Sequence, residues 1–231
     1  MPGPRWLPLE SNPDVMNAYM NKLGVDTNQW KYFDVYGTDP ELLMMVPQPV
    51  CSLLLLFPIT ENYEKFCREQ EKNMKKEDKN ISKDVYFTKQ TVGNACGTVG
   101  IIHSIANNLD VITLKNGCLK SFIEKSKLVS PIEKAKLLES DEGIAQCHGD
   151  SALEGQTKAP SADEKVNLHF IALVHKDGKL YELDGRRDFP VSHGPTNAAS
   201  FFQDAAVVCK KFMERDPTLL QFNMIALANA Q

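Results

Sequence analysis

The chain has 231 residues, of which 42% are hydrophobic. That is enough to bury one substantial core, so we expect a single domain spanning residues 1–231. The 26 basic and 30 acidic residues give a formal net charge of -4. This balance argues against nucleic acid or an anionic membrane as the main partner, because such binding depends on clustered positive charge. The longest apolar run, VCSLLLLF, is far shorter than the roughly 20 residues of a membrane-spanning helix.

The first residues and the spacing of the cysteines indicate the cellular compartment in which we expect the protein. The start, MPGPRWLPLESNP, has neither a basic stretch nor an unbroken apolar stretch, so we expect no secretory signal and a cytoplasmic location. Six cysteines, at positions 51, 67, 96, 118, 147 and 209, form no CxxC pair and no metal-ligand spacing. A reducing compartment keeps such cysteines as thiols, so neither disulfides nor zinc are expected.

The first predicted elements follow from caps, breakers and apolar spacing. Ser11 as N-cap and Pro13 in the first turn predict a helix that ends at Gly24. DPELLMMV predicts a short helical turn, and the apolar run at 50–57 that follows two prolines predicts a buried strand. TENYEKFCREQEKNMKKEDKN has apolar residues at helical spacing among many charges, which is typical of an exposed amphipathic helix.

The middle of the chain predicts a central helix flanked by surface elements. DVYFT, at 84–88, predicts a strand, and the apolar positions after Cys96 predict a helix buried on most faces. CLKSFIEKSKL and SPIEKAKLLES predict surface helices, the second with a capping box formed by Ser130 and Glu133. Residues 143–165 lack periodicity and predict a long loop, which in a compact domain is typical of a functional segment.

The last third predicts a hairpin, a helix and a strand. LHFIALVHKDGKLYELDG alternates apolar residues around an Asp177-Gly178 turn. TNAASFFQDAAVVCKKFMER predicts a late amphipathic helix, and FNMIALAN predicts the last strand.

The register of the hairpin brings a histidine toward an aspartate. With a two-residue turn at 177–178, facing positions sum to 355, so Asp184 faces Ile171, two residues from His169. His169 and Asp184 then form a diagonal pair on one face, about 7–8 Å apart, and their side chains can hydrogen-bond. A slip of one residue would place them on opposite faces. A carboxylate that holds one imidazole nitrogen leaves the other free to accept a proton from a nucleophile.

Cys96 is the candidate nucleophile. It stands at a predicted helix N-terminus, where the helix dipole and a nearby imidazolium both favour the thiolate. Gly97 lets a substrate carbonyl approach the backbone, and the Gln90 amide could join the Cys96 backbone N–H in stabilising an oxyanion. Alone, each residue has a structural interpretation: the cysteine as a small buried hydrophobe, the histidine as a satisfied strand residue and the aspartate as a turn former. Only their combination indicates thiol chemistry.

Three segments carry a specific family resemblance. QTVGNACGT, NLHFIALV and LYELDGR resemble the glutamine-cysteine, histidine and aspartate motifs of the ubiquitin carboxyl-terminal hydrolases, a family of thiol proteases. The resemblance runs nearly end to end, through RWLPLESNP and FDVYG near the start and VCKKFMERDP near the end. It is strongest to the small single-domain members, and among them to the widely expressed isozyme rather than the neuron-enriched one.

The resemblance implies a fold and a catalytic set. The implied fold is α/β (α+β, papain-like cysteine proteinase), with a central, mostly antiparallel sheet between helical layers, a knotted backbone and a crossover loop over the active site. The implied roles are Cys96 as nucleophile, His169 as general base and acid, Asp184 as orienting carboxylate and Gln90 as oxyanion donor. No metal or other cofactor is implied.

The resemblance also implies a partner. In the family, acidic residues meet the basic tail of ubiquitin, which agrees with the net charge of -4. Residues matching regions that contact ubiquitin or cross the cleft are Pro8, Leu9, Glu10, Ser11, Asn12, Pro13, Ala152, Leu153, Glu154, Gly155, Gln156, Thr157, Lys158, Ala159, Leu219, Leu220, Gln221, Phe222, Asn223 and Met224.

The function implied is that of a monomeric deubiquitinating hydrolase. It would cleave after the C-terminal glycine of ubiquitin, and of a close ubiquitin-like modifier, to release small adducts or peptide extensions. Two alternatives stay open. One is a ubiquitin-binding protein that sequesters or stabilises free ubiquitin with little turnover, and the other is a related thiol hydrolase or acyltransferase acting on a different acyl group.

Overall fold

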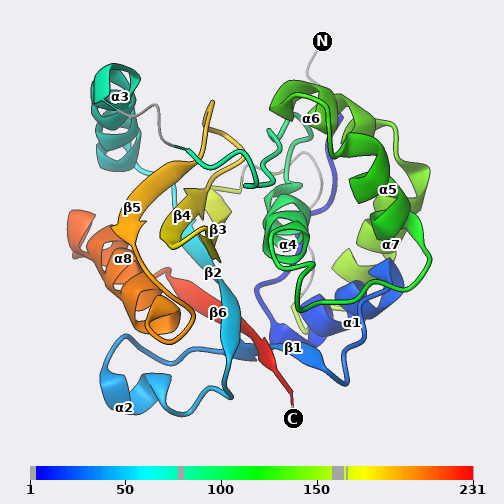
Figure 1. Ribbon diagram of the computed structural model, residues 1–231, viewed down its shortest axis with the longest axis horizontal. Helices are drawn as coiled ribbons and strands as arrows, with labels where there is room; N and C mark the ends of the chain where they lie inside the picture. The colour runs from blue at the N-terminus through cyan, green and yellow to red at the C-terminus, as the bar shows by residue number, and fades with distance from the viewer. Residues whose placement is uncertain (1–3, 78–80, 158–163, 165, 231) are drawn as a thin grey trace.

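A central antiparallel sheet organises the protein (Figure 1). The computed structural model describes residues 4–77, 81–157, 164 and 166–230. Within them the sheet has six strands in the order β1-β6-β2-β3-β4-β5, and every neighbouring pair is antiparallel. The strands are β1 (Trp30–Asp34), β2 (Val50–Pro58), β3 (Leu168–Lys176), β4 (Lys179–Leu183), β5 (Val191–Pro195) and β6 (Asn223–Asn229). This confirms the predicted, mostly antiparallel central sheet.

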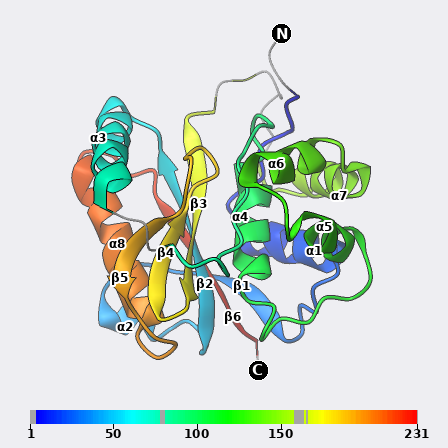
Figure 2. The ribbon, with the colours of Figure 1, turned by 45° about the horizontal axis from the view of Figure 1, so that its top comes forward.

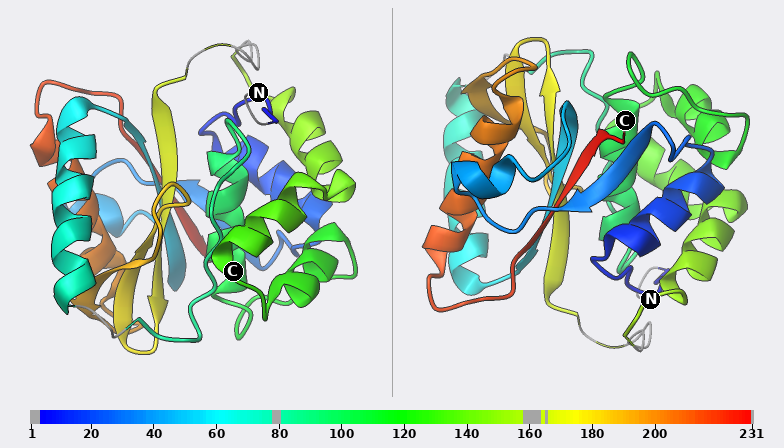
Figure 3. Two further views of the ribbon diagram at one scale, coloured as in Figure 1. Left: turned by 90° about the horizontal axis from the view of Figure 1, so that it is seen from above. Right: turned by 90° about the horizontal axis from the view of Figure 1, so that it is seen from below.

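Helices lie on both sides of the sheet (Figures 1 and 2). On one side are α1 (Pro13–Leu23), α4 (Cys96–Ala106), α5 (Cys118–Ser126), α6 (Pro131–Glu139) and α7 (Glu142–Ala152). On the other side are α2 (Pro40–Leu43), α3 (Glu61–Glu77) and α8 (Phe201–Arg215). The two views of Figure 3 show the sheet between these layers. Among the helices described, none has both the length and the apolar character needed to cross a membrane.

The unbroken apolar run of β2 follows from this three-layer arrangement. Leu54 belongs to the core cluster on the α4 side, whereas Leu53 and Leu55 belong to the cluster on the α8 side. All three are fully buried. Because successive strand residues point to opposite faces, a strand covered on both faces needs apolar residues at every position.

The hairpin of β3 and β4 has the predicted register. Lys176 pairs with Lys179 and Ala172 with Leu183, so facing positions sum to 355. Asp177 and Gly178 both have left-handed backbone angles, with φ of 48° and 74°. This is the geometry of a tight two-residue turn. The ladder ends at Leu183, so Asp184 is the first residue to leave it.

Helix α4 packs closely on the middle of the sheet because it carries two glycines where it touches β2 and β3. A Cβ added at Gly100 would lie 3.1 Å from the Leu54 side chain. A Cβ at Gly97 would lie 3.2 Å from Leu9 and 3.6 Å from Phe170. Small residues at these contacts set the depth at which the first turn of α4 sits against β3.

The predicted strand at 84–88 is absent, because another element takes its backbone hydrogen bonds. Asn107, which follows α4, accepts from the Tyr86 N–H and donates to the Tyr86 carbonyl, both at 2.8 Å. The Thr88 N–H donates to Nε2 of His103 at 3.0 Å. The backbone of Tyr86 and Thr88 is therefore bound to side chains rather than to a neighbouring strand.

The predicted loop at 143–165 is also corrected, since its first part is helix α7. The Asp141 side chain accepts from the Ile144 N–H at 2.9 Å and caps this helix. Its buried face consists of Ile144, His148, Ser151 and Ala152. Those positions have helical spacing, but only some of them are apolar, so the hydrophobic pattern is weak.

The N-cap of α1 is Asn12 rather than the predicted Ser11. The Asn12 Oδ1 accepts from the Asp14 N–H at 2.9 Å. Ser11 Oγ instead donates to Asn223 Oδ1 at 3.0 Å, which ties the start of the chain to β6. The predicted end at Gly24 is confirmed by its left-handed φ of 98°.

The cap can be tested by substitution. Asn12→Ala removes the acceptor for the first-turn N–H and should lower the free energy of unfolding by about 1 kcal/mol. Asn12→Ser keeps a side-chain oxygen at the cap and should retain most of the stability. Denaturant titration of both variants measures the difference, and equal losses would show that the cap does not stabilise α1.

Candidate active site

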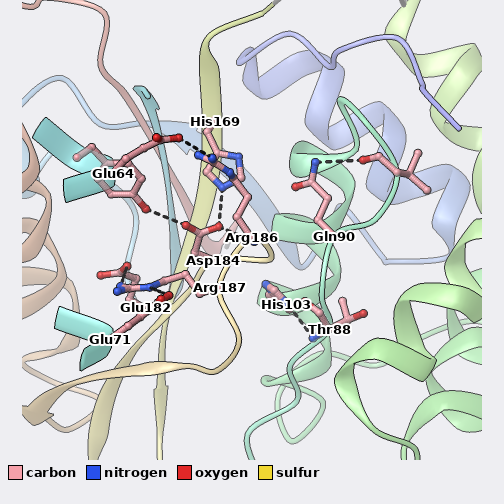
Figure 4. A network of polar contacts seen from close by, with 12 residues as sticks. Glu64, Glu71, Thr88, Gln90, His103, His169, Glu182, Asp184, Arg186 and Arg187 are labelled. Carbon is pink, nitrogen blue, oxygen red and sulfur yellow. Dashed lines mark hydrogen bonds and ion pairs between the residues drawn. The ribbon is translucent and has the colours of Figure 1, made fainter. Parts of the chain in front are cut away.

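His169 and Asp184 are in direct contact at one end of the hairpin (Figure 4). His169 is the second residue of β3 and pairs with Phe57 of β2. The distance from His169 Nε2 to Asp184 Oδ1 is 2.7 Å, and the two residues are only 3% and 1% exposed. The hydrogen bond expected from the hairpin register is therefore confirmed.

Asp184 is held as a buried carboxylate by three donors. Besides His169, the Tyr63 hydroxyl donates to Oδ2 at 2.8 Å, and the Arg186 backbone N–H donates to Oδ1 at 2.8 Å. Burial by itself would raise the pKa of this carboxyl. The charge and hydrogen bond of His169, followed by the other two donors, outweigh burial and hold the Asp184 pKa well below its usual range.

The imidazole of His169 responds in the opposite direction. Burial by itself would lower its pKa, but Asp184, and then Cys96, raise the pKa of His169 to about 9. An ionised carboxylate only accepts hydrogen bonds, so the proton between the two residues is on Nε2. The other ring nitrogen, Nδ1, is thus the one left to contact the thiol.

Cys96 lies at the first position of α4 and is partly exposed. Burial of the thiol opposes its ionisation. A hydrogen bond from His169, the imidazolium charge and the backbone N–H groups of Phe170 and Gly97 favour the thiolate more strongly, so the Cys96 pKa lies below its ordinary value. In the described part of the chain no side chain caps this helix end, so the positive end of the helix dipole also faces the sulfur.

A cavity of about 210 Å³ opens beside the Cys96 thiol. Its walls come from the N-terminal segment, the end of α7 and the start of β3. The lining residues are Pro8, Leu9, Glu10, Ser11, Leu56, Cys96, Ala152, Thr157, Val166, Leu168 and Phe170. Residues 8–11 and residues 152 and 157, from two of the segments implied by the family resemblance, therefore meet at the candidate nucleophile.

Glu10 joins these two segments. Its Oε2 accepts from both the N–H and the hydroxyl of Thr157, at 2.9 and 2.6 Å, and its Oε1 accepts from the Gln156 N–H at 3.4 Å. A Cβ at Gly155 would lie 2.5 Å from Glu10 Oε2. We call this set of contacts between Glu10 and residues 155–157 the Glu10 clasp.

The other implied contact residues are spread over the surface nearby. Leu219, Leu220, Phe222, Asn223 and Met224 line a second hollow of about 850 Å³ between α8 and residues 34–39. Gln221 and Leu153 are exposed, and Glu154 forms an ion pair with Lys22 at 2.9 Å. Asn12 and Pro13 begin α1. Lys158 and Ala159, which the family resemblance assigns to the crossover loop, lie outside the described residues.

Gln90 lies next to the Asp184 segment. Its backbone N–H donates to the Gly185 carbonyl at 2.7 Å, and a Cβ at Gly185 would lie 2.9 Å from the Gln90 Cβ, so only glycine permits this approach. The Gln90 Nε2 donates to the Val92 carbonyl at 3.1 Å (Figure 4), which uses one of its two N–H groups. Its Oε1 is buried and has no hydrogen-bond partner in the part of the chain described.

Sequence reasoning missed the polar network behind Asp184. Arg187, 3% exposed, bonds Gln70 at 2.7 Å and the buried Glu182 at 3.3 Å, and Glu182 also contacts His193 at 2.8 Å. Figure 4 shows Arg187 and Glu182 of this network beside Glu71 of α3. The sequence signal for α3 was its amphipathic spacing, which does not reveal which helix residues reach the site.

The site joins a thiol, an imidazole and a carboxylate in consecutive contact, and the thiol lies at a helix N-terminus beside a cavity. This arrangement is typical of thiol hydrolases. Among the described residues there is no group of three or more His, Cys, Asp or Glu side chains arranged to hold a metal ion.

Comparison with known proteins makes the class specific. Residues 6–214 match the model of the family described as ubiquitin carboxyl-terminal hydrolase, family 1. A ubiquitin carboxyl-terminal hydrolase of Aplysia californica is 51% identical over 217 residues, covering 93% of this chain and 98% of that protein. The Drosophila melanogaster protein is 47% identical over 226 residues, covering 98% of each chain. The rat isozyme L1 is 45% identical and covers 96% of this chain and 98% of its own. The chain belongs to this family.

A solved structure supports the fold independently. The Trichinella spiralis UCH37 catalytic domain, bound to ubiquitin vinyl methyl ester, superimposes with a TM-score of 0.76. It covers 100% of this chain and 98% of its own at 20% sequence identity. At that identity the match shows the fold.

The pKa shifts of Cys96 and His169 predict how alkylation depends on pH. At about pH 7, iodoacetamide should modify wild-type Cys96 at least about tenfold faster than Cys96 in His169→Gln, because the imidazolium stabilises the thiolate. The wild-type rate should fall as pH drops through the lowered Cys96 pKa. Above about 9, His169 loses its proton and the variant thiol begins to ionise, so the two rates should converge.

Mass spectrometry of the Cys96 peptide gives these rates. Cys209, whose pKa is raised by burial, is the internal reference that should stay unmodified in the folded protein. Equal wild-type and variant rates at neutral pH would show that no thiolate–imidazolium pair forms.

Proposed function

We propose that this protein is a deubiquitinating thiol hydrolase that cleaves after the C-terminal glycine of ubiquitin through a thioester on Cys96. The observation that carries the proposal is the chain of contacts from the Cys96 thiol through His169 to Asp184. Membership of the ubiquitin carboxyl-terminal hydrolase family supports the choice of substrate.

The reaction begins from the thiolate. Cys96 attacks the carbonyl carbon of the C-terminal glycine and forms a tetrahedral oxyanion. His169, in its protonated form, gives its Nδ1 proton to the leaving amine, and the intermediate collapses to the thioester. Neutral His169 then takes a proton from water, which attacks the thioester and releases ubiquitin. Asp184 holds the imidazole in the tautomer and orientation that both transfers require.

The oxyanion needs donors that are already in place. We assign this role to the Cys96 backbone N–H and the Gln90 side-chain amide. The hydrogen bond from Gln90 to Val92 and the close approach of the Gln90 Cβ to Gly185 restrict this side chain, which supports the assignment. Rigid donors cost no reorganisation when negative charge develops.

The same surfaces offer places for ubiquitin. The cavity beside Cys96 is small and suits an extended C-terminal tail, whereas the larger hollow lined by residues 219–224 suits part of a folded domain. The net charge of -4 favours a basic tail. Cleavage of a close ubiquitin-like modifier, a monomeric state, a single domain over residues 1–231 and a cytoplasmic location belong to the same proposal. The knotted backbone implied by the family stays a prediction.

Residues 152–159 act in this proposal as a gate over the cleft. The Glu10 clasp supports the idea, since it holds residues 155–157 to the N-terminal wall of the cavity. A gate of fixed length would admit small or flexible leaving groups and reject folded proteins.

Removal of the thiol tests the proposed chemistry. Cys96→Ala should abolish hydrolysis of a fluorogenic ubiquitin C-terminal amide, and it should leave ubiquitin affinity within a few-fold of wild type, because only the nucleophile is lost. Turnover by the purified variant and by wild type, measured beside ubiquitin binding, decides the point.

The rival functions give different results in the same assay. A protein that only sequesters ubiquitin would bind it without turnover in both forms. A thiol hydrolase for another acyl group would neither bind ubiquitin nor react with a ubiquitin C-terminal electrophile. Turnover that survives the loss of Cys96 would show that the nucleophile is wrong.

Lengthening the gate tests its role. Insertion of glycine and serine residues after Gly155 should increase the rate on ubiquitin fused to a folded protein by tenfold or more and leave the rate on the small amide nearly unchanged. Competition between the two substrates in one reaction measures this selectivity. An unchanged ratio would mean that the loop does not limit access.

A further inference from the structure

Helix α3 contacts the carboxylate oxygen of Asp184 that His169 does not bind. The Tyr63 hydroxyl is 2.8 Å from Asp184 Oδ2, whereas His169 and the Arg186 N–H both bind Oδ1. Figure 4 shows the dashed contact from α3 reaching Asp184 on the face away from α4. Each of the two carboxylate oxygens therefore has its own anchor.

The tyrosine ring is fixed by packing. Tyr63 is 4% exposed, and its ring lies edge-on against Phe57 at 4.7 Å and tilted against Phe212 at 5.9 Å. Cys67, one turn further along α3, interacts electrostatically with this hydroxyl. A hydroxyl on a buried, wedged ring has one narrow range of positions, so it can hold its partner in place.

Further contacts fasten α3 to the chain that follows Asp184. Glu64 pairs with Arg186 at 3.1 Å. Gln70 and the Cys67 carbonyl accept from Arg187 at 2.7 and 3.4 Å. These bonds hold α3 against the segment that follows Asp184. The hydrogen bond from Tyr63 to Asp184 is therefore one of several contacts in this interface.

We propose that Tyr63 is a positioning residue that holds the Asp184 carboxylate in the orientation His169 needs during catalysis. The inference rests on the proposed function, because it assigns a task to Asp184 that only the thiol mechanism requires. A carboxylate bound at only one oxygen can rotate about the bond to its Cβ. The hydrogen bond from Tyr63 to the second oxygen prevents this rotation. Without the hydroxyl, Oδ2 would remain buried and lose this donor, which favours a reoriented carboxylate.

Tyr63→Phe removes the hydroxyl and keeps the ring packing. We expect kcat on the fluorogenic ubiquitin amide to fall about tenfold, with KM within about twofold, because the loss of one hydrogen bond to a charged group acts on the transition state. The pH profile of Cys96 alkylation should move to higher pH, since a less firmly held Asp184 stabilises the imidazolium less. Glu182, Arg187 and Cys67 also face this hydroxyl, so profiles are compared at one ionic strength.

Tyr86→Phe is the matched control. The Tyr86 hydroxyl is also buried and forms a hydrogen bond with Ser126 Oγ at 2.6 Å, and within the described residues it has no hydrogen bond to Cys96, His169 or Asp184. This variant should keep the wild-type kcat and alkylation profile. Thermal denaturation of both variants separates a general loss of stability from a change at the site.

A double-mutant cycle identifies the route of the effect. If Tyr63 acts through Asp184, then Tyr63→Phe should change kcat less than twofold in an Asp184→Asn background. If Tyr63→Phe lowered kcat by the same factor in wild type and in Asp184→Asn, the inference would be overturned. It would also be overturned if Tyr63→Phe kept the same kcat and alkylation profile as Tyr86→Phe. If wild type shows no Cys96-dependent hydrolysis, the proposed function fails, whereas the alkylation profiles still report whether Tyr63 supports the imidazolium.

Discussion

The buried hydrogen bond between His169 and Asp184 is the interaction on which the site depends. Two charged groups removed from water cost several kcal/mol each unless they are paired and their remaining polar atoms are bonded. The tight turn of the hairpin fixes the register that pairs them. Tyr63 and the Arg186 N–H donate the other hydrogen bonds to the carboxylate of Asp184. Because the pKa of His169 is raised to about 9, its contribution to stability is complete below its ordinary value of 6.5 and is lost as pH rises through 9. Asp184, whose pKa is lowered, contributes above its ordinary value of 3.8 and loses that contribution in stronger acid.

Close packing of α4 on the sheet brings the Cys96 thiol to the pair of His169 and Asp184. The two glycines of α4 let its first turn approach β3, which places a thiol within reach of a histidine that comes more than seventy residues later. The sulfur then lies beside an imidazolium and at the positive end of a helix. One interaction therefore shifts both pKa values, lowering that of Cys96 and raising that of His169.

Local patterns predicted the parts of the fold that are stabilised locally. The Asp177-Gly178 turn, the apolar run of β2 and the capping box at Ser130 have short-range causes, and all three are confirmed. The sequence did not predict β1 and β5, because WKYFD and VSHGP lack the alternation of apolar and polar residues, next to a clear turn, that indicated β4. Residues 84–88 have strand-forming side chains, yet α4 and Asn107 take their backbone hydrogen bonds. For the same reason Tyr63 could not be found from spacing, since its importance depends on which helix packs against Asp184.

The strength of the contacts divides the site into a fixed centre and adjustable walls. His169 and Asp184 are almost fully buried and belong to a hairpin or its immediate end, so moving either one would break several bonds. The ion pair of Lys22 with Glu154 and the Glu10 clasp involve partly exposed side chains, 31% and 46% exposed for the ion pair. Exposed ion pairs of this kind contribute about 0–1 kcal/mol each. The contacts between the walls of the cavity are therefore weak, whereas His169 and Asp184 are held by several buried bonds.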